Sequence, residues 1–81
     1  MRYGLAMELV KAGELERAAA EFEPVRQIDP SYAAAYYHGG QTLERLGRLD
    51  DARKCYSQGI DLTADAHARS ELQAALDILG E

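Results

Sequence analysis

The chain has 81 residues, of which 47% are hydrophobic, so one small domain with a buried core is expected rather than a disordered segment. Its net charge is −5, and acidic and basic residues are mixed along both halves, which argues against a nucleic-acid partner. No apolar run approaches the roughly 18 residues of a membrane span, and no apolar leader is visible. We therefore expect neither a membrane partner nor export.

A single cysteine, Cys55, can form neither an internal disulfide nor a cysteine metal site, which predicts a reduced, cytoplasmic setting. Large side chains are few, with five Tyr, one Phe and no Trp, and alanine supplies much of the apolar content. Alanine favours helices but removes little area from water. The composition therefore predicts thin, closely packed helices.

The first apolar period starts at Tyr3 and stops at Gly13, where glycine suits the left-handed residue that follows a helix. A second helical run begins at Leu15 and continues to Ile28. Pro24 lies inside this run and lacks the N–H that a helix interior needs. Because the apolar stripe continues to Ile28, a kinked helix is expected rather than one that ends at the proline.

A third helix is expected from about Tyr32 to Leu46, after the break at Asp29-Pro30-Ser31, with Ser31 as its N-cap. It contains Gly39-Gly40, and two glycines inside a helix cost roughly 2 kcal/mol relative to alanine. Such a pair predicts that the backbone of another helix comes too close for side chains.

Gly47 ends the third helix, and a fourth is expected from Leu49 to Leu62. Asp65 is expected to cap a fifth helix that reaches Leu79. The expected buried stripe of the fifth helix is Ala68, Leu72, Ala75, Leu76 and Leu79.

The two hairpins match each other at a spacing of 34 residues. Identical residues at this spacing are Tyr3 and Tyr37, Leu9 and Leu43, Gly13 and Gly47, Leu15 and Leu49, and Ala18 and Ala52. Similar residues include Lys11 and Arg45, Phe22 and Tyr56, and Ile28 and Leu62. A period of 34 with aromatic, small and glycine positions of this kind is typical of tetratricopeptide repeats.

On these residues the chain resembles a small, bacterial-type tetratricopeptide repeat (TPR) protein. The expected repeats cover about 1–30 and 31–64, with a capping helix at about 65–80. The resemblance implies an all-α fold, a right-handed superhelical stack of five helices. Three positions depart from the family pattern: Arg2 replaces a large aromatic residue, Ala64 stands one period after Pro30, and Gly59 replaces an alanine. Two repeats also fall short of the three usually needed to bury a continuous core, so the N-terminal face is expected to be under-covered.

No catalytic constellation is visible. His38 and His67 are separated by a turn and a long helix, and neither has ligand spacing around it. His38 is expected on a helix surface, and Cys55 is expected to pack rather than to react. We therefore predict no enzyme activity, no cofactor and no metal, and an enzyme or metal protein is the least favoured alternative.

The resemblance implies that the first helix of each repeat lines a concave groove for an extended peptide or a partner helix. Tyr, Met and Arg are enriched in interface cores, which agrees with a protein-binding scaffold. The alternative is a homodimer in which the weakly covered first helix pairs with its two-fold mate. The predicted groove residues are Tyr3, Met7, Val10 and Lys11 from the first helix, and Tyr37, Gln41, Glu44 and Arg45 from the third.

Overall fold

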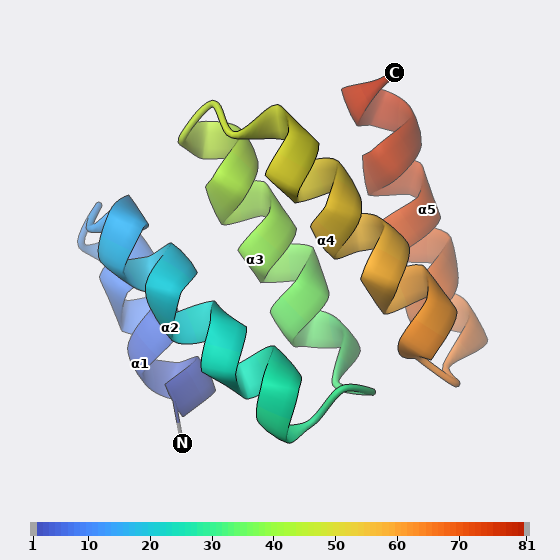
Figure 1. The fold of residues 1–81 in the computed structure, drawn as a ribbon, viewed down its shortest axis with the longest axis horizontal. Coiled ribbons are helices and arrows are strands. Elements are labelled where there is room, and N and C mark those ends of the chain that lie inside the picture. Colours follow the sequence, from blue (N-terminus) through green and yellow to red (C-terminus); the bar gives the residue numbers. More distant parts are fainter. Residues whose placement is uncertain (1, 81) are drawn as a thin grey trace.

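The computed structural model describes residues 2–80, and this part of the chain forms five helices and no strand (Figure 1). The predicted all-α class is confirmed. The helices are α1 (Arg2–Lys11), α2 (Leu15–Ile28), α3 (Ala33–Arg45), α4 (Leu49–Leu62) and α5 (Ala66–Leu79).

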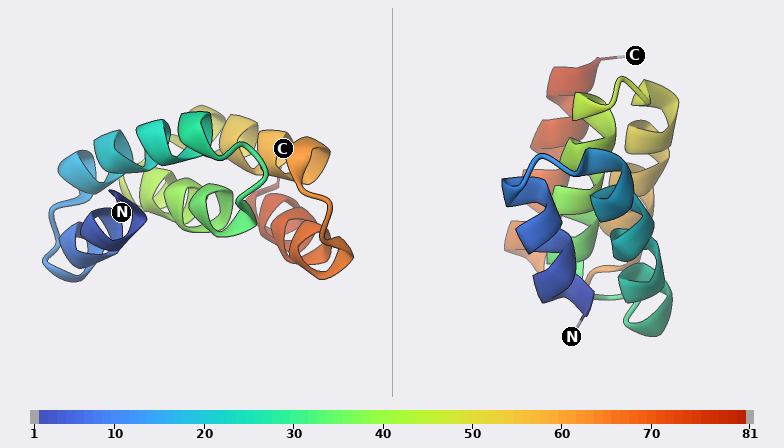
Figure 2. Two further views of the ribbon diagram at one scale, coloured as in Figure 1. Left: turned by 90° about the horizontal axis from the view of Figure 1, so that it is seen from below. Right: turned by 90° about the vertical axis from the view of Figure 1, so that its left-hand side faces the viewer.

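The helices form two layers of an arch. In Figure 2, α1, α3 and α5 form the inner layer, and α2 and α4 form the outer layer. The Cα atoms extend over 29 × 26 × 17 Å, and the shortest extent fits two helix layers about 8–10 Å apart. Each helix packs on the next one along the chain, and α3 also packs on α5. The predicted stack of helical hairpins is confirmed.

The two hairpin turns have the same geometry. Gly13 and Gly47 adopt φ values of 79° and 78°, in the left-handed region that favours glycine. In the first turn the N–H of Glu14 donates to the carbonyl of Leu9 at 2.8 Å. In the second, the N–H of Arg48 donates to Leu43 at 2.9 Å. Both glycines therefore end a helix through the same capping motif, as their positions in the sequence predict.

The glycines of α3 and α4 are contact sites for aromatic rings. A Cβ atom added to Gly40 would overlap the ring of Tyr56. A Cβ atom on Gly59 would lie 2.7 Å from the Cβ of Tyr36. The predicted close contact between helices is confirmed. The prediction that a backbone causes it is wrong, because the neighbouring atoms belong to side chains.

The core consists of two clusters rather than one. The larger cluster joins α3, α4 and α5, and the smaller cluster joins α1 and α2. The first hairpin therefore buries a small core of its own. The larger cluster contains Tyr36, Leu43, Ala52, Cys55, Tyr56 and Leu72, and the smaller one contains Ala6, Leu9, Ala18 and Phe22.

Two local predictions are wrong. Ile28 does not join the buried stripe, since 77% of its surface is exposed, and Leu62 is exposed at the equivalent place. Ile28 and Leu62 each lie in the last turn of their helix. Each points about 60° away from the last buried residue of that helix, which is Val25 in α2 and Gly59 in α4. Ser31 does not cap α3; its hydroxyl bonds the carboxylate of Asp29 at 3.2 Å, and α3 has no side-chain cap. By contrast, α2 continues through Pro24, as expected.

Candidate functional site

The predicted groove residues lie on the two inner helices α1 and α3. Tyr3, Met7 and Val10 are half-buried and pack against the smaller cluster. Lys11 is exposed beside Glu8, with 4.0 Å between the charged groups. The α3 residues divide in the same way, with Tyr37 and Glu44 half-buried and Gln41 and Arg45 exposed.

Aromatic rings connect α1 to α3. The centroid of the Tyr3 ring lies 5.2 Å from that of Tyr32 and 6.2 Å from that of His38. His38 in turn lies 5.3 Å from Tyr37. The structure therefore brings Tyr3 and Tyr37 into one row through His38, a residue predicted only as a surface position. We call Tyr32, Tyr3, His38 and Tyr37 the aromatic row.

A cavity of about 550 Å³ continues the inner surface from α3 onto α5. Three members of the aromatic row, Tyr32, Tyr37 and His38, contribute to its lining, and α5 contributes His67 and Glu71. The sequence-based prediction treated α5 only as a cap and missed this contribution. The signal was present in the alternation of layers, because the helix that follows α4 returns to the inner layer, as α3 does after α2.

One predicted groove residue is engaged within the chain. Tyr56 crosses from α4 over Gly40, and its hydroxyl donates a short hydrogen bond to Oε2 of Glu44. Burial, and then this bond to a carboxylate, raise the pKa of Tyr56 far above its usual value of 10.0. The Glu44 carboxylate is therefore already hydrogen-bonded before any partner approaches it.

The aromatic row is expected to weaken in acid because of His38. Burial lowers the pKa of His38 below its usual 6.5, so the folded state favours the neutral ring. This contribution to stability is present above about pH 6.5 and is lost as the pH falls below that value. We expect the free energy of unfolding, measured with urea at pH 7, 6 and 5, to fall more steeply for the wild type than for His38→Gln.

His67→Gln is the matched control for this prediction. The side chain of His67 is 83% exposed and lies 3.5 Å from Glu71, so the substitution removes a histidine outside the aromatic row. A pH dependence that His38→Gln leaves unchanged would contradict the prediction.

Among residues 2–80, no group of three or more His, Cys, Asp or Glu side chains is arranged to hold a metal ion. None of the described helices has the length and apolar character to cross a membrane.

The paired antiparallel helices, the repeated glycine turns and the lined inner surface define a helical-repeat scaffold. The family model described as "Tetratricopeptide repeat" matches residues 9–78. The chain belongs to the tetratricopeptide repeat family. A TPR repeat-containing protein of Pseudomonas aeruginosa is 30% identical over 78 residues, which cover 96% of this chain and 73% of that protein.

Two solved structures of a tetratricopeptide repeat domain protein from Salinibacter ruber have the same fold. The solution structure is 41% identical with a TM-score of 0.91, and the match covers 98% of this chain and 83% of the other. The crystal structure is 42% identical with a TM-score of 0.86, with coverage of 96% and 90%.

Proposed function

We propose that the chain is a protein–protein interaction scaffold whose inner face binds an extended peptide or a partner helix, without chemistry of its own. The aromatic row is the observation that carries the proposal. Its rings are half-buried, so they are fixed in place while one side remains accessible. Rigid aromatic side chains provide a large contact area at a low entropy cost, and tyrosine is enriched among residues that dominate binding energy. The cavity between α3 and α5 extends this surface and gives a partner side chain a place to enter.

Replacing Tyr37 should reduce binding without unfolding the protein. Peptides selected from a random display library on the wild type are expected to bind Tyr37→Ala about tenfold more weakly or worse, as for a tyrosine at the centre of an interface. Arg17→Ala, an exposed position on α2, should bind them as the wild type does. Fluorescence anisotropy with the selected peptides measures both affinities. Selected peptides that bind Tyr37→Ala and the wild type equally would contradict the inner face as the site.

A second candidate function is homo-oligomerisation through α1. Leu5 is 48% exposed, and Met7 and Val10, on another side of the helix, are only half-buried, so α1 presents apolar area to solvent. Light scattering over a dilution series tests this candidate. A mass that remains that of one chain at the highest concentration would exclude it.

A further inference from the structure

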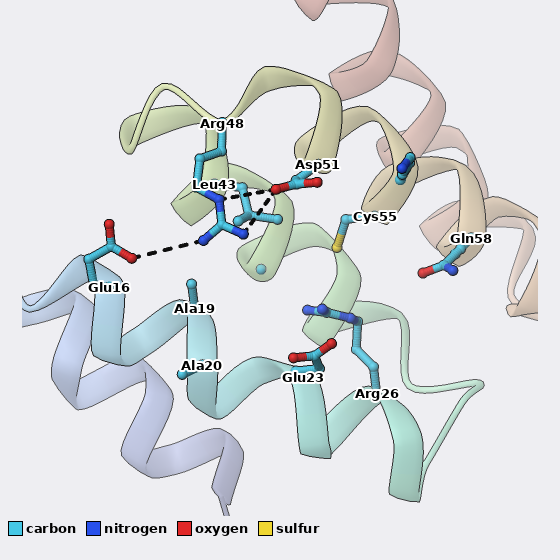
Figure 3. Close-up of a pocket in the computed structure, with 12 residues that line it drawn as sticks. Glu16, Ala19, Ala20, Glu23, Arg26, Leu43, Arg48, Asp51, Cys55 and Gln58 are labelled. Carbon is cyan, nitrogen blue, oxygen red and sulfur yellow. Dashed lines mark hydrogen bonds and ion pairs between the residues drawn. The ribbon is translucent and has the colours of Figure 1, made fainter.

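A second concave surface lies on the opposite side of the arch. The outer helices α2 and α4 form its two walls, and α3 lies between them at its floor (Figure 3). The space has a volume of about 370 Å³. We call it the outer cleft. Gly39 on α3, Arg26 on α2 and Cys55 on α4 line it where the three helices meet.

Arg26 extends from α2 into the outer cleft and lies on its floor. Its Nη1 atom is 2.7 Å from the position that a Cβ atom of Gly39 would occupy, so in this position it uses the space that glycine leaves open. Its Cζ atom lies 6.0 Å from the centroid of the Tyr36 ring, within the range of a cation–π contact. Figure 3 shows the guanidinium extending across the cleft near the Glu23 carboxylate, with the sulfur of Cys55 above it in this view.

Arg26 as a residue is half-buried, and its guanidinium has no hydrogen-bond or ion-pair partner among the described residues. The other arginines that contact neighbouring groups do have such partners. Arg48 bonds Asp51 at 2.9 Å, and Arg53 bonds Asp50 at 2.8 Å. Arg69 donates to the carbonyl of Thr63 at 2.9 Å. Because a guanidinium carries five donors, Arg26 can donate to an acceptor that enters the outer cleft.

No neighbour in the floor neutralises this charge. The Cys55 thiol donates to the carbonyl of Tyr36 at 3.4 Å. Burial raises the pKa of this thiol more than Arg26 lowers it, so the sulfur stays uncharged. Lys54 also lines the outer cleft and has no ion pair in the described chain. Glu23, three residues before Arg26 on α2, is the lining carboxylate at this end, and no ion pair joins it to Arg26. Arg26 and Lys54 therefore exceed it by one positive charge.

The other end of the outer cleft is acidic. Arg48 lies 2.9 Å from the carboxylate of Asp51 and 3.9 Å from that of Glu16, as the dashed lines in Figure 3 show. These two carboxylates outnumber the single charge of Arg48. Such a surface repels a multiply charged anion and accepts an isolated negative group at the Arg26 end.

We propose that the outer cleft binds a peptide segment of a partner protein through one acidic side chain, whose carboxylate accepts two N–H bonds from Arg26. The guanidinium fork matches a carboxylate in this bidentate geometry. Glu16 and Arg26 are ten residues apart on α2, a distance of about 15 Å along the helix. That length accommodates roughly four or five residues of an extended chain.

The test is a nuclear magnetic resonance titration of the whole ¹⁵N-labelled chain. The probe is acetyl-Ala-Ala-Glu-Ala-Ala-amide, and the comparison peptide has glutamine in place of glutamate. The glutamate peptide is expected to shift the Gly39 amide and the Arg26 Nε–H resonance, with a dissociation constant on the order of 1 mM. The glutamine peptide should bind about tenfold more weakly or worse, because the charge-assisted bonds are lost.

Arg26→Gln is expected to abolish the response to the glutamate peptide. Arg17→Gln is the matched control, because it removes the same charge from the same helix. Arg17 lies nine residues before Arg26, which places it on the opposite side of α2. Arg26→Lys keeps the charge without the fork and should bind with intermediate affinity. It decides the test if Arg26→Gln fails to show a folded circular dichroism spectrum.

Four results would overturn the proposal. They are equal shifts with both peptides, shifts confined to the inner face, a full response in Arg26→Gln, and inorganic phosphate producing the same shifts with the same affinity. The last result would mean a general anion site rather than a peptide site.

Discussion

Gly40→Leu is expected to lower the free energy of unfolding by about 3 kcal/mol or more. The Cβ atom alone would overlap the ring of Tyr56, which is fully buried and cannot move aside. Overpacking usually costs about 1–3 kcal/mol and occasionally more, and an overlap with a fully buried ring is expected to exceed that usual range, which outweighs the gain of under about 1 kcal/mol in helix propensity. For a domain of this size the melting temperature should fall by roughly 12–24 °C, measured by circular dichroism.

Two other glycines provide controls for that result. Gly39→Ala places its Cβ atom against the flexible end of Arg26, which can shift, so the melting temperature should change by only a few degrees. Gly4→Ala has nothing within 4 Å and should raise stability by up to about 1 kcal/mol. If Gly40→Leu has the same melting temperature as the wild type, Tyr56 does not lie over Gly40, and the packing described for α3 and α4 is incorrect.

Phe22→Ala is expected to unfold the first hairpin while the rest of the chain remains folded. Phe22 is fully buried and is the largest member of the smaller cluster. Truncating a buried phenylalanine typically costs about 3–5 kcal/mol. In a repeat protein such a loss falls mainly on the repeat that contains it. Hydrogen exchange should therefore show loss of protection in α1 and α2 and retention in α4 and α5.

Leu72→Ala applies the same test to the larger cluster. Leu72 is the buried residue through which α5 packs on α3 and α4, and its truncation typically costs about 2–5 kcal/mol. Protection should then be lost first in α5. If Phe22→Ala lowers protection evenly in all five helices, the two clusters unfold as one unit, contrary to this expectation.

The repeat period predicted the scaffold well because its signals are local. A left-handed glycine ends a helix through the conformation of one residue, so Gly13 and Gly47 could be placed from sequence. The same is true of Asp65, whose carboxylate accepts from the N–H of His67 at 2.9 Å as the expected N-cap. Ile28 was misplaced because periodicity gives the direction of a side chain and not whether another element covers it.

The candidate site was predictable only in part, for a related reason. Tyr3 and Tyr37 hold the same position in the two repeats, so the sequence places them on equivalent helix faces. The contacts that His38 makes with both rings depend on how α1 approaches α3, which the repeat spacing does not give. The position of Arg26 depends on three helices at once, and no spacing along one helix predicts it.

The hydrogen bond between Tyr56 and Glu44 has no equivalent in the first repeat. Thirty-four residues earlier, the same two positions hold Phe22 and Val10, and Val10 packs against the cluster that contains Phe22. Each repeat therefore has a pair of residues at these positions, one on its inner helix and one on its outer helix. The pair is apolar in the first repeat and polar in the second. The Tyr56 hydroxyl is an internal competitor for any partner cation that approaches Glu44. If the inner face binds a partner as proposed, its ligand preference is set partly by residues on the outer helices, and altering it requires exchanging these pairs together.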